Sequence, residues 1–529
     1  MGPVKDYLLG IDLGTTNIKA VIFDTRGESV ATASATYPLI MPGPNQVEQD
    51  AHAWWSAAVE ILRSVTSQAG EAVTAAIRGI SVSSQLPSLL PLDKDGNVLR
   101  NAMIWMDKRS RHELDEILDC MGREEYVASA GAQPDVAFLP CKLLWFKKHE
   151  PELFARTHRV LQANGYLNYM LTGVMAMDID QGALCQCLDL RTQTWSESLS
   201  KAMGMDLNAI LPQPVSSDTI IGHVTQQAAK ITGLKAGVPV VAGASDATAS
   251  MYATGLSRIG EAGESSGTTS LLFVGHTGPS ATDIPVVAKP CSIQGIPYFF
   301  NAPINTSGAS LKWYLTNLGK AEQDYADAHG INVYDYLNQL ALEAPAGSNG
   351  LLYFPYMLGE RAPLWNSHAT GMFIGLSLDT ERKHIIRSIF EGTAFAVRHV
   401  LDTIKDAGAR VDCLRITGGG SKSRTWCQIK ASMLGVPVYT LDDKTGDVPF
   451  GDALIAGHAV GLYPDFAKSI QELIQIKDTI QPVEEWARVY DKLYPYYLSM
   501  YRDLDSDLKS LKETMDSIQT LSNSKGEQS

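Results

Sequence analysis

Hydrophobic positions along the chain follow two patterns that alternate through most of its length. Short apolar runs typical of buried strands lie at residues 7–12, 20–23, 79–82 and 238–242. Apolar residues three or four positions apart, which are typical of amphipathic helices, lie at residues 53–65, 111–118 and 142–148. Strands that alternate with helices in this way predict an α/β fold.

The pattern of the first residues returns in the middle of the chain. The turn Gly267-Thr268-Thr269 and the strand-like run after it match Gly14-Thr15-Thr16 and the run that follows there. We interpret this match as an internal duplication, and we expect one domain over residues 1–250 and a second over residues 251–500. Further elements expected in the second half are helices at 309–318 and 381–407 and a strand at 413–417.

The tail over residues 501–529 carries one narrow apolar stripe. Its members, spaced alternately four and three residues apart, are Leu504, Leu508, Leu511, Met515 and Ile518. This spacing predicts an amphipathic helix that docks on its own protomer or on a neighbour, so a homodimer is one arrangement to consider. A loosely ordered, charged tail is the alternative.

Composition narrows the classes of function. The 529 residues exceed what one hydrophobic core usually serves, so two or three domains are expected. The net charge is −14 and basic residues form no cluster, which argues against nucleic acid as a partner. The seven cysteines are scattered, unlike a disulfide framework or a zinc site. No apolar run approaches the roughly 20 residues that span a bilayer, so we expect a cytoplasmic protein without a membrane partner.

The turn Gly14-Thr15-Thr16 is the first candidate for chemistry. Its backbone N–H groups and hydroxyls can hold phosphate oxygens. Asp12, at the end of the preceding strand, can face Mg²⁺ through water, since magnesium keeps much of its hydration shell. The turn at Thr268 can hold the same phosphates from the second domain. A plain hairpin turn is the alternative, and the chain has no G-x-x-x-x-G-K-[ST] P-loop.

Three further motifs follow or precede predicted strands. Asp246 comes shortly after the run at 238–242, where a carboxylate is either a helix N-cap or a general base that accepts a proton from a substrate hydroxyl. The glycines 418–420 follow a strand and let a flat base lie against the backbone, although a plain loop is the alternative. Residues 263–267 fit G-x-S-x-G, but strand-like residues follow them, whereas a nucleophile elbow needs a helix there.

Together these motifs resemble the FGGY family of carbohydrate kinases. The most specific stretch is 371–391, GMFIGLSLDTERKHIIRSIFE, which is similar to the C-terminal signature of that family. The other matching stretches are 142–145, 307–313, 358–363 and 418–420. The resemblance covers roughly residues 7–470. It implies two actin/hexokinase-like (ribonuclease H-like) α/β domains with a catalytic cleft between them, and ATP and Mg²⁺ as cofactors.

The resemblance also implies roles for individual residues. Asp246 is expected to be the catalytic base, and Asp12 is expected to face the metal. The residues expected to bind ATP are Gly14, Thr15, Thr16, Asn17 and Lys19 in the first domain and Thr268, Gly308, Lys312, Gly419 and Ser423 in the second. The residues expected around the sugar are Gln85, Leu86, Pro87, Ser88, Trp105 and Asp107, with Asp246 at the reacting hydroxyl.

Within the family, the motifs are most similar to those of xylulokinases, so the expected reaction is ATP-dependent phosphorylation of a ketopentose. Leu86-Pro87 departs from the pattern, because xylulokinases and gluconokinases tend to carry Met-His there. This change removes a polar contact to the sugar, so gluconate, ribulose, erythritol and other polyols stay open as substrates. The rival of another class is a non-catalytic ATPase switch of the actin/Hsp70 fold. A dehydrogenase is disfavoured because the dinucleotide fingerprint is missing.

Overall fold

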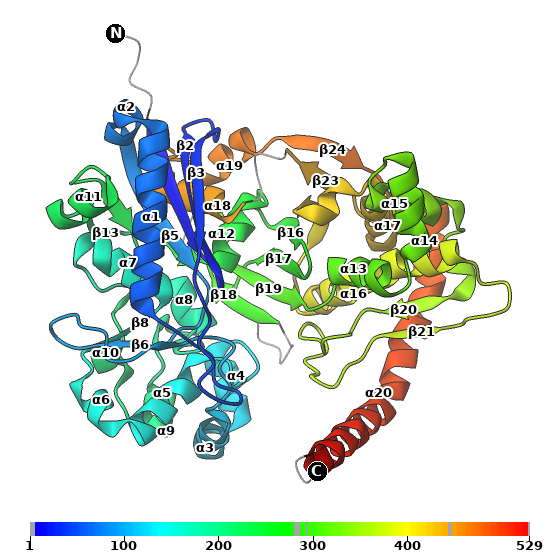
Figure 1. Ribbon diagram of the computed structural model, residues 1–529, viewed down its shortest axis with the longest axis horizontal. Helices are drawn as coiled ribbons and strands as arrows, with labels where there is room; N and C mark the ends of the chain where they lie inside the picture. The colour runs from blue at the N-terminus through cyan, green and yellow to red at the C-terminus, as the bar shows by residue number, and fades with distance from the viewer. Residues whose placement is uncertain (1–5, 280–285, 292–294, 443–446, 527–529) are drawn as a thin grey trace. The chain divides into compact units, whose positions relative to one another are not determined.

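The computed structural model describes residues 6–279, 286–291, 295–442 and 447–526 (Figure 1). By their internal contacts the residues form two compact units. Unit 1 comprises Met1–Ile259, Val274–Asn301 and Asp442–Gln475, and unit 2 comprises Gly260–Phe273, Ala302–Leu441 and Ile476–Ser529. The sequence boundary that we place near residue 250 stays a prediction.

Unit 1 contains most of the strands and short helices of the first half of the chain. Its strands are β1 (Tyr7–Leu13), β2 (Asn17–Asp24), β3 (Ser29–Thr36), β4 (Glu48–Gln49), β5 (Ile77–Ser84), β6 (Leu90–Leu92), β7 (Ala102–Met103), β8 (Arg159–Leu161), β9 (Met177–Asp178), β10 (Leu188–Asp189), β11 (Thr194–Trp195), β12 (Pro214–Val215), β13 (Ile220–His223), β14 (Pro239–Val241), β15 (Ala244–Ser245) and β18 (Val287–Pro290). Its helices are α1 (Ala51–Ala69), α2 (Glu71–Ala75), α3 (Arg111–Met121), α4 (Arg123–Ala130), α5 (Leu139–His149), α6 (Pro151–Arg156), α7 (Ala163–Thr172), α8 (Ile179–Leu184), α9 (Glu197–Met203), α10 (Leu207–Ile210), α11 (Gln226–Thr232), α12 (Asp246–Ala253), α18 (Val448–Ala459) and α19 (Phe466–Leu473).

The main sheet of unit 1 has the order β13-β14-β5-β1-β2-β3, and β15 also pairs with β5. β1 is parallel to β5 and antiparallel to β2. Successive residues of β1 point to opposite faces: Leu9 and Ile11 join the core that contains α1 and α7, whereas Gly10 faces α18. A Cβ on Gly10 would lie 1.9 Å from the carbonyl oxygen of Pro449, so only glycine lets α18 pack this closely.

Unit 2 contains the remaining elements, wholly or in part. Its strands are β16 (Gly260–Ser266), β17 (Ser270–His276), β19 (Tyr298–Ile304), β20 (Leu352–Phe354), β21 (Met372–Ile374), β22 (Val411–Thr417), β23 (Val438–Leu441) and β24 (Ile476–Ile480). Its helices are α13 (Gly308–Asn317), α14 (Lys320–His329), α15 (Val333–Glu343), α16 (Arg382–Asp406), α17 (Arg424–Leu434), α20 (Glu484–Gly526) and the 3₁₀ turns η1 (Ser348–Gly350) and η2 (Gly419–Lys422). β16 is parallel to β22 and β22 is parallel to β23, so both units are α/β, as predicted.

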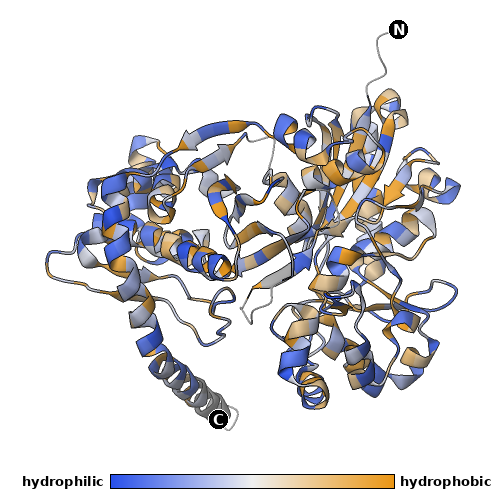
Figure 2. Ribbon diagram, turned by 180° about the vertical axis from the view of Figure 1, so that it is seen from behind, coloured by the Kyte–Doolittle hydropathy of each residue, from blue (hydrophilic) through white to orange (hydrophobic). Residues whose placement is uncertain are grey.

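The predicted tail helix is the end of α20. Nearer its start, Tyr490 and Tyr497 are buried, and Tyr497 stacks on Phe354 of β20 with ring centroids 4.6 Å apart. Leu511 and Met515 are 59% and 46% exposed in the single chain. Figure 2 shows apolar residues in both strands and helices, and mixed colouring along the part of α20 that is not grey. In the described ranges, none of the helices has both the length and the apolar character needed to cross a membrane.

Candidate active site

The carboxyl ends of β1, β5 and β15 meet at one edge of the main sheet in unit 1. Asp12 of β1 lies opposite Ser83 of β5, and Ser245 of β15 lies opposite Ser84. Asp246 follows Ser245 as the first residue of α12. The parallel strands therefore place both predicted acidic residues at the same edge, on either side of β5, which is where open α/β sheets bind their ligands.

Asp12 is a half-buried carboxyl with little to balance its charge. Burial and the charges of Asp246 and Asp447 raise the pKa of Asp12 to about 8. Ser83 Oγ donates to Asp12 Oδ1 at 3.4 Å, but this hydrogen bond and the charge of Lys19 lower the pKa only in part. Lys19 is itself paired with Asp447. An added cation would therefore stabilise the ionised form of Asp12.

Asp246 starts α12 but does not cap it. Ser245 is the N-cap, and its Oγ accepts from the backbone N–H of Thr248 at 3.0 Å. The Asp246 carboxylate accepts from the N–H of Ala247 at 2.7 Å. Burial raises the pKa of Asp246 to about 6, while the Ala247 N–H and the charge of Lys289 lower it. The N-cap alternative for Asp246 is therefore wrong, and the group is a carboxylate at neutral pH.

Asp452 of α18 lies under this edge of the sheet and is a residue that the sequence did not single out. It is fully buried. Its carboxyl accepts from Ser81 Oγ at 2.9 Å and from Ser83 Oγ at 2.7 Å. Burial, and then the charge of Asp12, raise the pKa of Asp452 well above its ordinary value. The serines of β5 therefore link Asp12 to a second carboxyl that is distant in sequence.

The first predicted phosphate turn is a tight loop between β1 and β2. Gly14 N–H donates to the carbonyl of Asn17 at 2.9 Å. Tyr37 Oη donates to the carbonyls of Gly14 and Asn17, the latter at 3.1 Å. Thr16 and Asn17 are exposed at the tip. The buried tyrosine holds the loop while its tip is open to solvent.

Trp105 and Gln85, two predicted sugar-site residues, are tied to the same loop. Trp105 Nε1 donates to Thr15 Oγ1 at 3.1 Å, and the Trp105 side chain is 39% exposed. Gln49 Nε2 donates to the Thr15 carbonyl at 2.6 Å, and Gln85 Nε2 donates to Gln49 Oε1 at 2.6 Å. The Oε1 of Gln85 is buried and has no hydrogen-bond partner among the described residues. It is therefore a buried acceptor that the described residues leave unsatisfied.

Leu86, Pro87 and Ser88 continue from the end of β5. Leu86 is half-buried against Ala132 and Leu184. The Ser88 N–H donates to Gln162 Oε1 at 2.7 Å, whereas the buried Ser88 Oγ lacks a partner within the described part of the chain. This segment therefore has an apolar side chain, Leu86, near two buried polar atoms without partners among the described residues, Gln85 Oε1 and Ser88 Oγ.

Asp107 is placed differently from the other predicted sugar-site residues. It is fully buried. Its Oδ2 accepts from the Val47 N–H at 2.8 Å, and both oxygens accept from Arg109 Nε, at 2.9 and 3.0 Å. The backbone carbonyl of Asp107 accepts from Lys142 Nζ. These bonds fix the loop that carries Trp105, so the carboxylate of Asp107 is already satisfied.

The second predicted phosphate turn lies in unit 2, between β16 and β17. Gly308 N–H donates to the Gly267 carbonyl at 3.0 Å, and Ser307 N–H donates to the Thr268 carbonyl at 3.1 Å. A Cβ on Gly308 would lie 2.5 Å from Gly267 O, so the start of α13 packs directly on the turn. Thr268 is exposed, and Lys312 is exposed one turn further along α13. Because α13 packs on the turn, the exposed side chains of Thr268 and Lys312 belong to the same locally packed part of unit 2.

Gly419 is the first residue of η2 in unit 2, and Ser423 follows its last residue. A Cβ on Gly419 would have no neighbour nearer than 4.0 Å, whereas one on Gly418 would lie 2.6 Å from Ser266 O. The backbone at Gly419 is therefore open on the side where a base could lie. Ser423 is the N-cap of α17, and its Oγ accepts from Trp426 N–H at 3.0 Å and donates to Asn338 Oδ1 at 2.5 Å.

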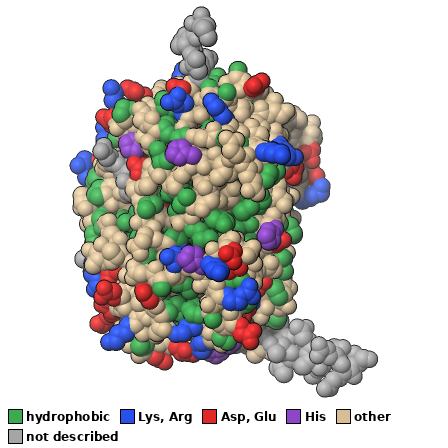
Figure 3. Space-filling model, turned by 90° about the vertical axis from the view of Figure 1, so that its left-hand side faces the viewer, with side chains coloured by type: hydrophobic (Ala, Val, Ile, Leu, Met, Phe, Trp, Pro, Cys, Tyr) green, Lys and Arg blue, Asp and Glu red, His purple; other side chains and the backbone are tan. Residues whose placement is uncertain are grey.

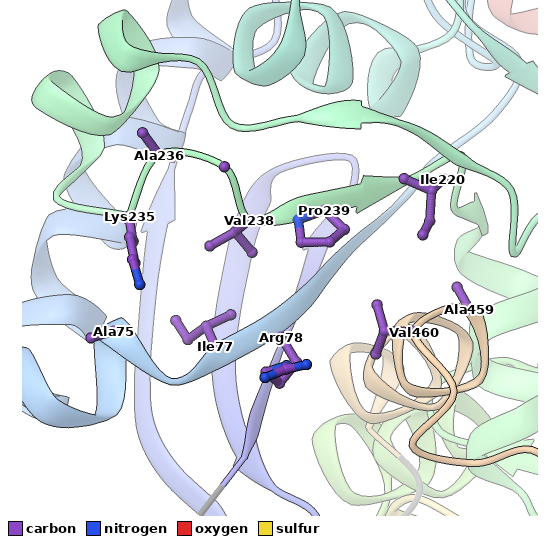
Figure 4. Close-up of a pocket in the computed structure, with 11 residues that line it drawn as sticks. Ala75, Ile77, Arg78, Ile220, Lys235, Ala236, Val238, Pro239, Ala459 and Val460 are labelled. Atoms are coloured by element: carbon purple, nitrogen blue, oxygen red, sulfur yellow. The ribbon is translucent and has the colours of Figure 1, made fainter. Parts of the chain in front are cut away.

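A cavity of about 570 Å³ lies away from these residues in unit 1 (Figure 4). It lies between the loop of Lys235, the start of β5 at Ile77 and Arg78, and the end of α18 at Val460. The cavity contains none of the predicted site residues.

The face shown in Figure 3 carries basic and acidic side chains interspersed with each other. Among the described residues, no group of three or more His, Cys, Asp or Glu is arranged to hold a metal ion.

Comparison with known proteins agrees with this arrangement. Residues 7–253 match the N-terminal domain, and residues 264–460 the C-terminal domain, of the FGGY family of carbohydrate kinases. The chain belongs to this family. It is therefore a sugar kinase, and the resemblance seen in the sequence is confirmed.

Individual relatives align with nearly the whole length of this FGGY kinase. The chain is 28% identical to xylulose kinase of Bacillus subtilis, and the alignment covers 96% of this chain and 99% of that one. It is 26% identical to gluconokinase of the same organism, with 96% and 98% covered. The crystal structure of xylulose kinase from Rhodospirillum rubrum superposes with a TM-score of 0.84 at 29% identity, covering 95% and 99% of the two chains. The predicted two-domain fold of this family is thereby confirmed.

Proposed function

We propose that this FGGY kinase transfers the γ-phosphoryl group of ATP to a hydroxyl of a small sugar or polyol, with Asp246 as the general base. The observation that carries the assignment is the position of Asp246: a half-buried carboxylate at the sheet edge, with a pKa of about 6. A base with a pKa just below the working pH is ionised and still accepts a proton well. The non-catalytic switch is set aside because the chain is a carbohydrate kinase.

In the proposed step, the substrate hydroxyl oxygen forms a bond to the γ-phosphorus while the bond to ADP breaks. The hydroxyl proton passes to the Asp246 carboxylate. Little further covalent chemistry is needed, because phosphoryl transfer depends mostly on in-line positioning and on neutralising phosphate charge. The first turn of α12 positions Asp246 for this role, since Ser245 caps the helix and the Ala247 N–H orients the carboxylate.

Asp12 fits a role toward Mg²⁺. Its carboxylate offers the oxygen ligands that Mg²⁺ prefers. Burial and the charges of Asp246 and Asp447 destabilise the ionised form, so a nearby cation would lower the raised pKa of Asp12. When bound, Mg²⁺ would neutralise charge on the phosphates of ATP. A single carboxylate that contacts the ion through water is consistent with the preference of magnesium for its own hydration shell.

For ATP, we propose that the turn at Gly14, Thr15, Thr16 and Asn17, with Lys19, and the turn at Thr268 hold the phosphates. The exposed hydroxyls of Thr16 and Thr268 support this assignment. Gly308, Lys312, Gly419 and Ser423 would surround the nucleoside. The open backbone at Gly419 supports it best, whereas Ser423 would act through the start of α17, since its hydroxyl is already bonded on both sides.

For the sugar, we propose a ketopentose, with gluconate, ribulose, erythritol or another polyol as alternatives. Relatives named xylulose kinase and gluconokinase support this range. Gln85 Oε1 would accept from a sugar hydroxyl, Trp105 would cover one face of the sugar, and Leu86-Pro87 would form an apolar wall. Asp107 would fix the loop that carries Trp105, because its carboxylate is bound by Val47 and Arg109.

The test is ADP release with Mg·ATP over D-xylulose, D-ribulose, gluconate and erythritol, for the wild type and for Asp246→Asn. We expect Asp246→Asn to fold, to bind Mg·ATP and to lose about 10²- to 10⁴-fold in kcat. The matched control is Asp95→Asn, which changes an exposed carboxylate on a turn and should leave kcat unchanged. A kcat of Asp246→Asn within about threefold of the wild type would remove this residue from the proposed role.

A further inference from the structure

Beneath the first turn of α12, unit 1 buries a lysine with two aspartates. Lys289 of β18, Asp178 and Asp180 are each at most 1% exposed. Lys289 Nζ lies 3.2 Å from Asp180 Oδ1 and 4.5 Å from the centre of the Phe299 ring. Burying a charge is costly unless it is paired and hydrogen-bonded. A buried ion pair at this place therefore needs an explanation beyond stability.

The pair is bonded to two residues around the first turn of the helix that carries the proposed base. Asp180 Oδ2 accepts from Ser245 Oγ at 3.2 Å and from Thr248 Oγ1. Lys289 Nζ donates to Thr248 Oγ1 at 2.9 Å and approaches Ser245 Oγ at 3.4 Å. Ser245 is the N-cap immediately before Asp246. The ion pair thus holds the residue before the base and the residue two positions after it.

The other acidic group at this place does not compete for the lysine. Asp178 Oδ1 accepts from the Gln181 N–H at 2.9 Å and caps α8. Burial and the neighbouring Asp180 raise the pKa of Asp178 well above its ordinary value. The carboxylate oxygen that pairs with Lys289 therefore belongs to Asp180.

We propose that the Lys289–Asp180 ion pair positions the Asp246 carboxylate for catalysis by fixing the first turn of α12. This inference rests on the proposed function. Neither residue touches the reacting atoms in this role, so both are positioning residues. Displacement of a catalytic group by about 1 Å can cost about a hundredfold in rate. The pair therefore acts on kcat and leaves the binding of sugar and ATP unchanged.

The test compares Lys289→Met, Asp180→Asn and the double variant, with D-xylulose and Mg·ATP as substrates. Each single variant leaves one buried charge unpaired and should lower both the Tm and kcat. The double variant removes both charges, so we expect its Tm to recover toward that of the wild type. Its kcat should stay at least about tenfold below the wild-type value, and its KM values should lie within about threefold of those of the wild type. This separation of kcat from Tm is what a purely structural pair would not produce.

The matched control is the buried Arg387–Glu391 pair of α16 in unit 2, with a separation of 2.7 Å. Arg387→Met with Glu391→Gln should change the Tm without lowering kcat. Recovery of wild-type kcat by the Lys289→Met, Asp180→Asn double variant would overturn the inference. If Asp246→Asn itself keeps its kcat, the proposed base is wrong. If Asp246→Asn loses activity and the double variant keeps it, only the positioning role is wrong.

Discussion

Asp12→Asn should stabilise the ligand-free protein at neutral pH, although Asp12 faces the proposed metal. The pKa of Asp12 is raised to about 8 by burial and by the charges of Asp246 and Asp447. An unfolded aspartate titrates near about 3.9. The folded state therefore keeps a proton that the unfolded state releases, and its stability falls as the pH rises between these two values. Asparagine cannot ionise, so it removes this loss.

The magnitude follows from the pKa difference. From about pH 4 to pH 7 the wild type loses up to about 4 kcal/mol, at about 1.4 kcal/mol per pH unit. Because the side chain is half-buried, solvent screening reduces this to about 2 kcal/mol. Unit 1 is larger than a domain of 150 to 250 residues, so about 2 kcal/mol corresponds to a rise in Tm of about 3 °C. The gain should vanish near pH 4 and level off above pH 8.

Differential scanning calorimetry at pH 4.5 and pH 7.5 in EDTA measures the effect, with Asp95→Asn as the control for an exposed carboxylate. Added Mg²⁺ should then raise the Tm of the wild type but not that of Asp12→Asn, since a ligand stabilises only the state that binds it. An equal Tm difference at both pH values, or a variant less stable than the wild type at pH 7.5, would refute the electrostatic argument.

Four other outcomes are expected. Thr16→Val and Thr268→Val should each weaken ATP binding far more than sugar binding in calorimetry; unchanged ATP affinity in both contradicts the phosphate roles of the turns. As Asp246 must be ionised and its pKa is about 6, kcat should fall about tenfold per pH unit below that value, and a flat profile speaks against the base. Pro87→His should raise kcat/KM for D-xylulose relative to the best native substrate; high selectivity of the wild type for D-xylulose over its epimers would show the Leu86-Pro87 argument to be wrong. If the tail stripe docks on a neighbour, Leu511→Glu with Met515→Glu should lower the mass by light scattering, whereas a wild type that is already monomeric rules this out.

Local patterns predicted much of the fold. The helices expected at 53–65, 111–118 and 381–407 fall within or almost within α1, α3 and α16, because in each the apolar stripe is long enough to signal one buried face. The strands at either end of the Gly-Thr-Thr turns were also predictable, since a short turn between two apolar runs leaves few alternatives. The tail was predicted as a helix, but its start at Glu484 was not. Pro495 lies inside α20 and interrupts the helical signal.

The supporting residues of the site could not be predicted, because they come together only through the fold. Asp452 reaches Ser81 and Ser83 from α18, which is far away along the sequence. Lys289 lies in a short strand without a marked pattern, and only the fold brings it to Asp180. An isolated Asp or Lys in a sequence is usually a solvated side chain. Burial and pairing, which give these residues their effect, are tertiary properties.

The proposed sugar pocket narrows the class of substrate that we expect. Gln85 Oε1 and Ser88 Oγ are buried without partners among the described residues, and leaving such atoms unbonded is costly. A ligand that donates hydrogen bonds to both atoms would remove this free-energy cost. Substrates with hydroxyl groups on the side that faces Gln85 and Ser88 are therefore favoured. Leu86 and Pro87 between them offer no side-chain donor, and proline has no N–H. Selectivity should therefore come from hydroxyls that donate to Gln85 and Ser88. A site that hydrogen-bonds a hydroxyl discriminates far more strongly than an apolar wall, so substitution of Gln85 by Leu should reduce discrimination among polyols more than any change at Leu86.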